Sequence, residues 1–364
     1  MLAKSILVVG HGRMIDRIAM ARRVLCVGLG ESFQLAASYR RAFSALGWRV
    51  SGFDLDAAVR RQARLGVLGA RFNDFVPVES WVRKANREFL LAALEVRPDL
   101  VLVVGHVPLR VGALAQLVAS VPDTRSAFVW PDTLLNLGRD DLECLPFYDL
   151  VASYGKQSVE AFGRLGARRV EWIPLAADPE LHEADPLDDA TRARYAADVI
   201  FIGNHRPERE RSVLALLDAG ISVAVWGGDA WQKSSAAPGR VDHYWQGREL
   251  FGRELATASS VAKVCINLID PTNYPAANMR FFENLLFGVA TVNTGCPELA
   301  DIFRDAEHTV YAADDRALVS AIRRLLADEP LRRRVAAAGH SLVLAEHTYV
   351  HRARTLAERL GFAG

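Results

Sequence analysis

Arg280 and Glu283 stand three residues apart in an apolar segment, residues 278–288 (NMRFFENLLFG). Asn278 is a residue type that caps helices and Gly288 one that ends them, so the segment predicts a short helix. The apolar face of this helix consists of Phe282, Leu285 and Leu286. A cation and a carboxylate in the first turns, beside free backbone N–H groups, can hold a phosphate and a sugar hydroxyl together. We predict a nucleotide-sugar site here, formed by Asn278, Met279, Arg280 and Glu283.

A second polar loop follows a predicted strand earlier in the same half of the chain. Its Gly203 allows the backbone to approach a ligand, and the loop opens a helix whose N–H groups can bind anionic oxygens. Arg206 can neutralise a diphosphate, because a planar guanidinium makes paired hydrogen bonds to phosphate oxygens. We predict that Gly203, Asn204 and Arg206 belong to the site, and we interpret Arg209 as part of a solvated helix start.

Four positions in the first half also follow predicted strands, and their side of the sheet should face a cleft. They are Gly30, Glu31, His106 and Asp132. A sugar transfer that inverts configuration needs a general base, whereas a retaining transfer need not have one, and Asp132 and His106 are the candidates. Asp132 is equally consistent with a turn cap, and His106 with a solvated loop histidine. Both alternatives stay open.

Composition excludes several classes of protein. The 364 residues are 51% hydrophobic, which is enough for more than one core. The 44 basic and 43 acidic residues give a net charge of only +1, without the large positive excess typical of nucleic-acid binding. The apolar runs are too short to cross a bilayer, and the four cysteines lack metal-ligand spacing. We therefore expect a cytoplasmic protein with reduced cysteines and no transmembrane segment, and the excess of arginine over lysine favours a bacterial source.

Apolar strands alternate with helical segments through both halves. The predicted strands are 24–28, 49–53, 100–104, 127–130, 150–153 and 170–173, then 199–202, 221–226, 264–269, 289–293 and 309–311. Such strands are typical of parallel sheets covered on both faces. The prediction is an α/β chain with two Rossmann-like, doubly wound domains facing a central cleft. The polar stretch 179–196 predicts the linker, and residues 1–22 fit no element well.

Several segments resemble group 1 glycosyltransferases of the CgeB-like branch. In the second half they are 198–229, 278–288, 297–299 (PEL) and 346–353 (EHTYVHRA). In the first half they are 98–103 (PDLVLV), 128–132 (FVWPD), 148–151 (YDLV), 166–170 (GARRV) and 173–178 (IPLAAD). The resemblance implies a GT-B fold. It divides the chain into an acceptor domain (1–185), a nucleotide-sugar donor domain (186–340) and a crossover helix that returns to the first domain (341–364).

The resemblance also implies roles for individual residues. Glu283 falls on the second glutamate of the family's paired-glutamate motif, which binds ribose hydroxyls, whereas the first glutamate falls on Ala276 and is missing. The implied reaction moves a hexose or related sugar from a nucleoside-diphosphate donor to an unidentified acceptor, without a metal or other cofactor. Arg206 and Arg280 would stabilise the departing diphosphate.

Two other classes of protein remain open. Gly28-Leu29-Gly30 with Asp54 imitates the NAD(P)-binding fingerprint of an oxidoreductase, although Phe33 stands where a third glycine is expected. A non-catalytic sugar-nucleotide-binding protein also fits, because the paired-glutamate motif is incomplete. Asp54 and Asp56 imitate the metal-binding carboxylates of a different glycosyltransferase fold, but their place after a strand favours a loop, and we predict no metal site there.

Overall fold

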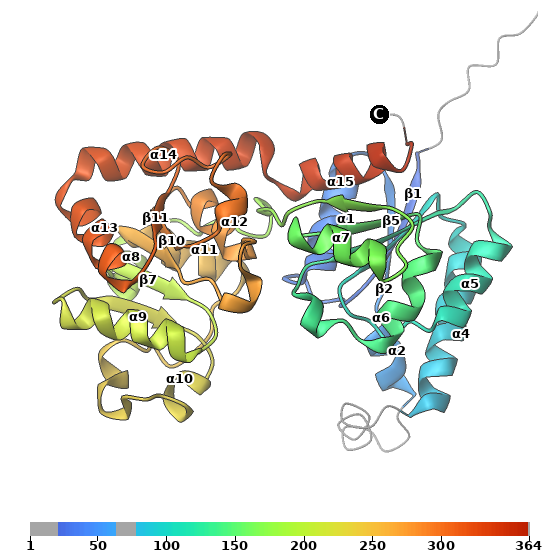
Figure 1. The fold of residues 1–364 in the computed structure, drawn as a ribbon, viewed down its shortest axis with the longest axis horizontal. Coiled ribbons are helices and arrows are strands. Elements are labelled where there is room, and N and C mark those ends of the chain that lie inside the picture. The colour runs from blue at the N-terminus through green and yellow to red at the C-terminus, as the bar shows by residue number, and fades with distance from the viewer. Residues whose placement is uncertain (1–20, 63–77, 363–364) are drawn as a thin grey trace, which may run out of the picture.

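Six parallel strands form the sheet of the first domain, in the order β2-β1-β3-β4-β5-β6. The computed structural model describes residues 21–62 and 78–362 (Figure 1). The strands are β1 (Arg23–Val27), β2 (Arg49–Phe53), β3 (Leu100–Val104), β4 (Arg125–Trp130), β5 (Leu150–Ser153) and β6 (Val170–Trp172). The strand order reverses between β1 and β3, which is the mark of a doubly wound sheet.

Helices cover both faces of this sheet. They are α1 (Leu35–Ala45), α2 (Leu55–Arg61), α4 (Glu79–Val96), α5 (Val111–Ser120), α6 (Arg139–Cys144) and α7 (Gln157–Arg164). Successive strand residues point to opposite faces, so one strand serves two cores. Val101 and Val103 of β3 pack with Phe89 of α4, whereas Leu100 and Leu102 pack with Tyr39 of α1.

The second domain has a five-stranded parallel sheet in the order β11-β10-β9-β7-β8. Its strands are β7 (Val199–Ile202), β8 (Val223–Trp226), β9 (Val264–Asn267), β10 (Ala290–Thr294) and β11 (Val310–Ala312). Its helices are α8 (Asp189–Tyr195), α9 (Pro207–Asp218), α10 (Ala230–Lys233), α11 (Gly252–Val261), α12 (Met279–Leu286), α13 (Asp315–Ala327) and α14 (Glu329–Glu346). The predicted pair of doubly wound domains is confirmed, and every predicted strand is present with ends at most two residues away.

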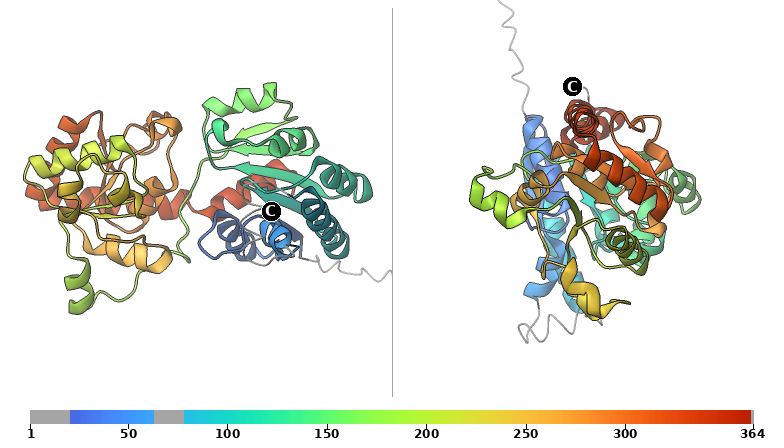
Figure 2. Two further views of the ribbon diagram at one scale, coloured as in Figure 1. Left: turned by 90° about the horizontal axis from the view of Figure 1, so that it is seen from below. Right: turned by 90° about the vertical axis from the view of Figure 1, so that its left-hand side faces the viewer.

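The C-terminal helices span both domains. Helix α14 lies along the second domain, and α15 (Tyr349–Arg359) lies along the first (Figures 1 and 2). Tyr349 and Leu356 of α15 join the core that contains Tyr39 of α1. The chain between these helices pairs with the residue just before the predicted linker, since Ala177 donates its N–H to the His347 carbonyl and accepts from Tyr349 N–H.

A buried arginine stabilises the connection between α14 and α15. Arg352 is 7% exposed, and its guanidinium donates to the carbonyls of Pro174, Leu175 and Glu346. It also donates to Nδ1 of His347 at 2.9 Å. Backbone carbonyls and an imidazole therefore satisfy a buried cation that has no carboxylate partner among the described residues.

His347 should make the fold sensitive to mild acid. Burial, reinforced by Arg352, lowers the pKa of His347 to about 3. The unfolded chain takes up this proton below pH ~6.5 and the folded chain does not, so stability falls as the pH drops through that value. His347→Asn keeps an acceptor for Arg352 but cannot titrate.

We expect urea unfolding between pH 7 and pH 5 to show a flatter decline for His347→Asn than for the wild type, by about 2 kcal/mol. Substitution of the exposed His243 by asparagine is the control and should keep the wild-type decline. Parallel curves for His347→Asn and the wild type would contradict the assignment.

Candidate functional site

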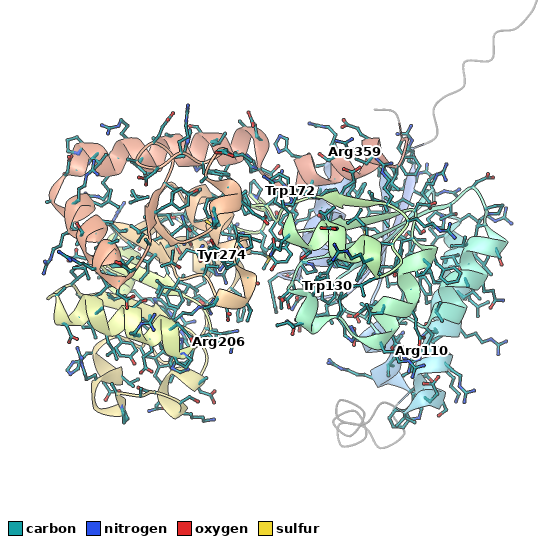
Figure 3. The ribbon with its side chains drawn as sticks, in the orientation of Figure 1. Arg110, Trp130, Trp172, Arg206, Tyr274 and Arg359 are labelled. Atoms are coloured by element: carbon teal, nitrogen blue, oxygen red, sulfur yellow. The ribbon has the colours of Figure 1, made fainter. Side chains whose placement is uncertain are left out.

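A cavity of about 380 Å³ lies between the two domains. It is lined by Phe33, Gln34, Leu35, Pro131, Asp132, Tyr154, Leu175, Asn273, Asn278, Met279 and Arg280. The first-domain residues follow β1, β4, β5 and β6, and those of the second domain follow β9, so the carboxyl ends of both sheets face this space. Figure 3 shows Trp130 and Trp172 on the first-domain side and Tyr274 across from them. The cavity brings the predicted Asp132 together with the predicted Asn278, Met279 and Arg280.

A buried row of amides fixes the start of α12. Asn278 accepts from the N–H of Phe281, as expected of a helix cap, and its own Nδ2 donates to Oδ1 of Asn267 at 3.0 Å. Asn267 donates to Asn293, and Asn293 donates to Thr309, each at 2.8 Å. The cap is thus tied to β9 and β10, and in the sequence this row is marked only by one asparagine in each of these strands.

Glu283 is buried and already partnered. Arg280 donates to its Oε2, and Nε2 of His182 lies 3.7 Å from its Oε1. Glu283 is 5% exposed and lies behind the cavity wall, which Arg280 itself lines. A carboxylate has about four acceptor sites, so two neighbours leave room for a sugar hydroxyl. His182 was not predicted as a site residue, because it lies in the polar linker, where no motif or periodicity marks it.

Arg206 lies away from the described wall of the cavity. Its Nε donates to Asp270 at 2.9 Å, and its side chain is 56% exposed. Burial would raise the pKa of Asp270, but hydrogen bonds from Arg206 and Thr272 hold it at about 2. Figure 3 shows Arg206 lower in the second domain than Tyr274. Arg206 is therefore paired with a carboxylate outside the described lining of the cavity, whereas Arg280 lines it.

Arg209 is not simply part of a solvated helix start, as predicted, because its side chain binds backbone carbonyls of two segments. Its guanidinium donates to the carbonyls of Leu268 and Asn204, at 2.8 and 2.9 Å. Burial lowers the pKa of Arg209. It also lines a second cavity, of about 300 Å³, at the carboxyl ends of β9 and β10. The arginine thereby joins the predicted Gly203–Arg206 loop to the segment before α12.

Glu210 stabilises the Gly203–Arg206 loop through buried hydrogen bonds. It is 1% exposed and accepts hydrogen bonds from His205, Ser235, Tyr244 and the N–H of Ala236. Burial would raise the pKa of Glu210, but these donors hold it at about 2. The indole of Trp231 also donates to the carbonyl of Gly203 at 2.9 Å. These contacts fix the positions of Gly203 and Asn204, and Trp231 and Tyr244 serve packing and hydrogen bonding within the protein.

On the first-domain side, Asp132 lines the cavity and also caps its turn. Its two oxygens accept from Thr133 N–H at 2.7 Å and Asn136 Nδ2 at 2.6 Å. His106 lies elsewhere at the same sheet edge, where its Nδ1 is 2.7 Å from the buried carboxylate of Asp141. This hydrogen bond raises the pKa of His106. Asp141 was not predicted, and the described lining of the cavity includes Asp132 but not His106.

The loop after β1 is organised by Asp54. Its Oδ2 accepts from Gly30 N–H at 2.7 Å, and its Oδ1 accepts from Ala57 N–H as the cap of α2. Glu31, beside Gly30, is exposed. In an NAD(P)-binding enzyme this carboxylate would bind a ribose hydroxyl; here each of its oxygens accepts a backbone N–H, and Phe33 stands where the third glycine of the fingerprint is expected.

Ala276, where the resemblance places a first glutamate, is completely buried. A Cβ atom built on Gly155 of the first domain would lie 3.2 Å from the Cβ of Ala276. The two domains touch at this point, flanked by hydrogen bonds from Tyr154 to Asn273 and from Lys156 N–H to Glu298. A longer side chain at 276 would push the contact apart, which explains the alanine.

Within the described ranges, no group of three or more His, Cys, Asp or Glu side chains is placed to hold a metal ion. The four cysteines are buried and unpaired. No helix in residues 21–62 and 78–362 is long and apolar enough to cross a membrane.

Two Rossmann-like domains with facing strand ends define the GT-B fold, and comparisons with known proteins agree. Residues 208–358 match a family model described as glycosyl transferase-like. Sucrose-phosphate synthase from Thermosynechococcus elongatus is structurally similar, with a TM-score of 0.65, 16% identity and coverage of 93% of this chain and 98% of that chain. Comparison with curated proteins gave no match.

Two further solved structures share the fold over nearly the whole chain. HepE from Anabaena, solved in complex with UDP, has a TM-score of 0.61 at 14% identity and covers 94% of this chain and 100% of that one. Trehalose-6-phosphate synthase has a TM-score of 0.65 at 16% identity, with the same coverage. At these identities the likeness establishes the fold: GT-B, as predicted.

Proposed function

We propose that this protein is a glycosyltransferase that moves a sugar from a nucleoside-diphosphate donor to an acceptor in the interdomain cavity. The main observation behind this proposal is that one cavity is lined by Arg280 and the start of α12 on one side and by Asp132 of the opposite domain on the other. The glycosyl transferase-like family model and the UDP held by the structural neighbour HepE support a nucleotide-sugar donor. We further propose a hexose or related sugar, transfer without a metal ion, and membership of the CgeB-like branch.

The roles follow from charge and position. Breaking the anomeric bond leaves negative charge on the diphosphate, and Arg280 with the free N–H groups of α12 is placed to stabilise it. Glu283 binds the ribose hydroxyls through lone pairs that Arg280 and His182 leave free. Asp132 contacts the acceptor or the sugar, and in an inverting reaction it would take the acceptor's proton. Arg206 and Arg209 tie the Gly203–Arg206 loop to the segment before α12, through Asp270 and the carbonyl of Leu268.

Nucleotide binding tests this proposal directly. We expect UDP, GDP or ADP to raise the thermal stability of the protein, because a ligand at 100 times its Kd adds about 2.7 kcal/mol. Thermal-shift titration of the three nucleotides, with NAD(H) in parallel, is the measurement. Donor hydrolysis with and without cell extract as acceptor then separates an enzyme from a non-catalytic binder. Stabilisation by NAD(H) alone would instead favour the oxidoreductase.

A further inference from the structure

A histidine of the interdomain linker reaches the buried carboxylate of α12. The side chain of His182 is 5% exposed, and its Nε2 lies 3.7 Å from Oε1 of Glu283. Its Nδ1 is buried, and none of the described residues provides a hydrogen-bond partner for it. The ring packs edge-on against Phe287 at 5.7 Å between centroids. A buried imidazole without a partner on one nitrogen needs a reason, since such groups are rare.

The geometry selects the tautomer of this imidazole. A neutral imidazole has one N–H and one acceptor nitrogen. Buried N–H groups without acceptors are rarer than acceptors without donors, so the proton belongs on Nε2, facing Glu283. The present 3.7 Å is longer than a hydrogen bond. A shift of roughly 0.8 Å, from 3.7 to the usual ~2.9 Å, would close it.

The other side of His182 is tied to the first domain. The backbone N–H of His182 donates to the backbone carbonyl of Asp178. The carboxylate of Asp178 in turn accepts from Nε of Arg41 at 2.9 Å. Arg41 also donates to the carbonyl of Ser32 at 3.0 Å. Ser32 precedes Phe33 and Gln34, which line the cavity. Hydrogen bonds therefore connect Ser32, next to the first-domain wall of the cavity, through Arg41 and Asp178 to the backbone of His182, whose imidazole lies 3.7 Å from the carboxylate of α12.

We propose that His182 is a positioning residue for Glu283, and that its Nε2–H holds Oε1 so that the free lone pairs of the carboxylate face the ribose of the donor. Arg280 holds the other oxygen, so the two partners fix both ends of the carboxylate. His182 touches no substrate in this scheme. The inference rests on the proposed function, because it assumes a nucleoside diphosphate in the cleft.

Three substitutions separate positioning from packing. His182→Phe keeps the bulk but has no N–H. His182→Gln places an amide N–H near the position of Nε2, whereas His182→Asn places it near the unpartnered Nδ1. The wild type and the variants are titrated with UDP, GDP and ADP, and with inorganic pyrophosphate, which lacks the ribose.

We expect His182→Phe and His182→Asn to raise the Kd of the bound nucleotide about tenfold, as the loss of one charged hydrogen bond would. His182→Gln should stay within about threefold of the wild type, and the Kd of pyrophosphate should be unchanged throughout. In a Glu283→Gln background, His182→Phe should have less than about a twofold effect, because the carboxylate that His182 positions is then absent.

Wild-type affinity in a folded His182→Phe protein would overturn the proposal. So would equal losses for pyrophosphate and nucleotide, or full additivity with Glu283→Gln, since these mark a general packing role. Failure of the wild type to bind any of the three nucleotides would instead reject the proposed function, and this inference with it.

Discussion

Replacing Arg280 by methionine should lower the turnover number of sugar transfer by about 100-fold or more while the protein stays folded. Removing one preorganised donor from a developing anion typically costs ~3 kcal/mol in the transition state. Arg280 is the described cation that lines the interdomain cavity, with a quarter of its side chain exposed. Steady-state kinetics with saturating donor and acceptor would measure the change.

Arg206→Met is the matched control for this prediction. Arg206 is paired with Asp270 outside the described lining of the cavity and is more than half exposed, so we expect a loss of less than about tenfold. The sequence predicts the same role for both arginines, and only the fold shows that Arg280 lines the cavity whereas Arg206 does not. Equal losses for both variants, or a loss confined to acceptor affinity with unchanged turnover, would contradict the assignment of Arg280 to the departing diphosphate.

Cutting the chain after Ala345 should abolish transfer, because it removes α15 from the first domain. Tyr349, Ala353, Leu356 and Leu360 are all buried in the core shared with α1. At ~2 kcal/mol for each large apolar side chain, their loss approaches the entire stability of a typical domain. Helix α12 and its amide row lie wholly in the second domain, so some nucleotide binding should survive.

Circular dichroism, urea unfolding and nucleotide titration of the shortened chain would measure these effects. The matched control lacks only residues 363 and 364 and should keep full activity. A chain ending at Ala345 that folds and transfers sugar at the full rate would show that α15 is dispensable, and that the linker alone couples the two domains.

Local patterns were sufficient to predict the helix at the centre of the site. Asn278 accepts from Phe281 N–H, the expected apolar face is buried, and the chain turns at Gly288 with a positive φ of 68°. These features depend on neighbours within one or two turns, so the sequence encodes them directly. The parallel strands were equally predictable, because burial on both faces demands a continuous apolar run.

Partners of the polar side chains were not predictable in the same way. Glu283 meets His182 across 101 positions of the chain, and Arg206 meets Asp270 across 64. No periodicity links such pairs, because their approach depends on how strands are ordered in the sheet and how the linker returns. The same is true of His106 with Asp141, which converts a loop histidine into one oriented by a buried carboxylate.

The sequence by itself therefore determined the elements, the doubly wound domains and the residue types at the strand ends, since each follows from local burial and capping. Only the tertiary structure decided which of those residues meet: Asp132 and Arg280 share the cavity, while Arg206 and His106 lie beyond its described wall. It also explained Ala276 by the packing of Gly155 against it. Contacts between domains arise from the relative placement of two sheets, and that placement is the sum of many small packing terms that no short motif contains.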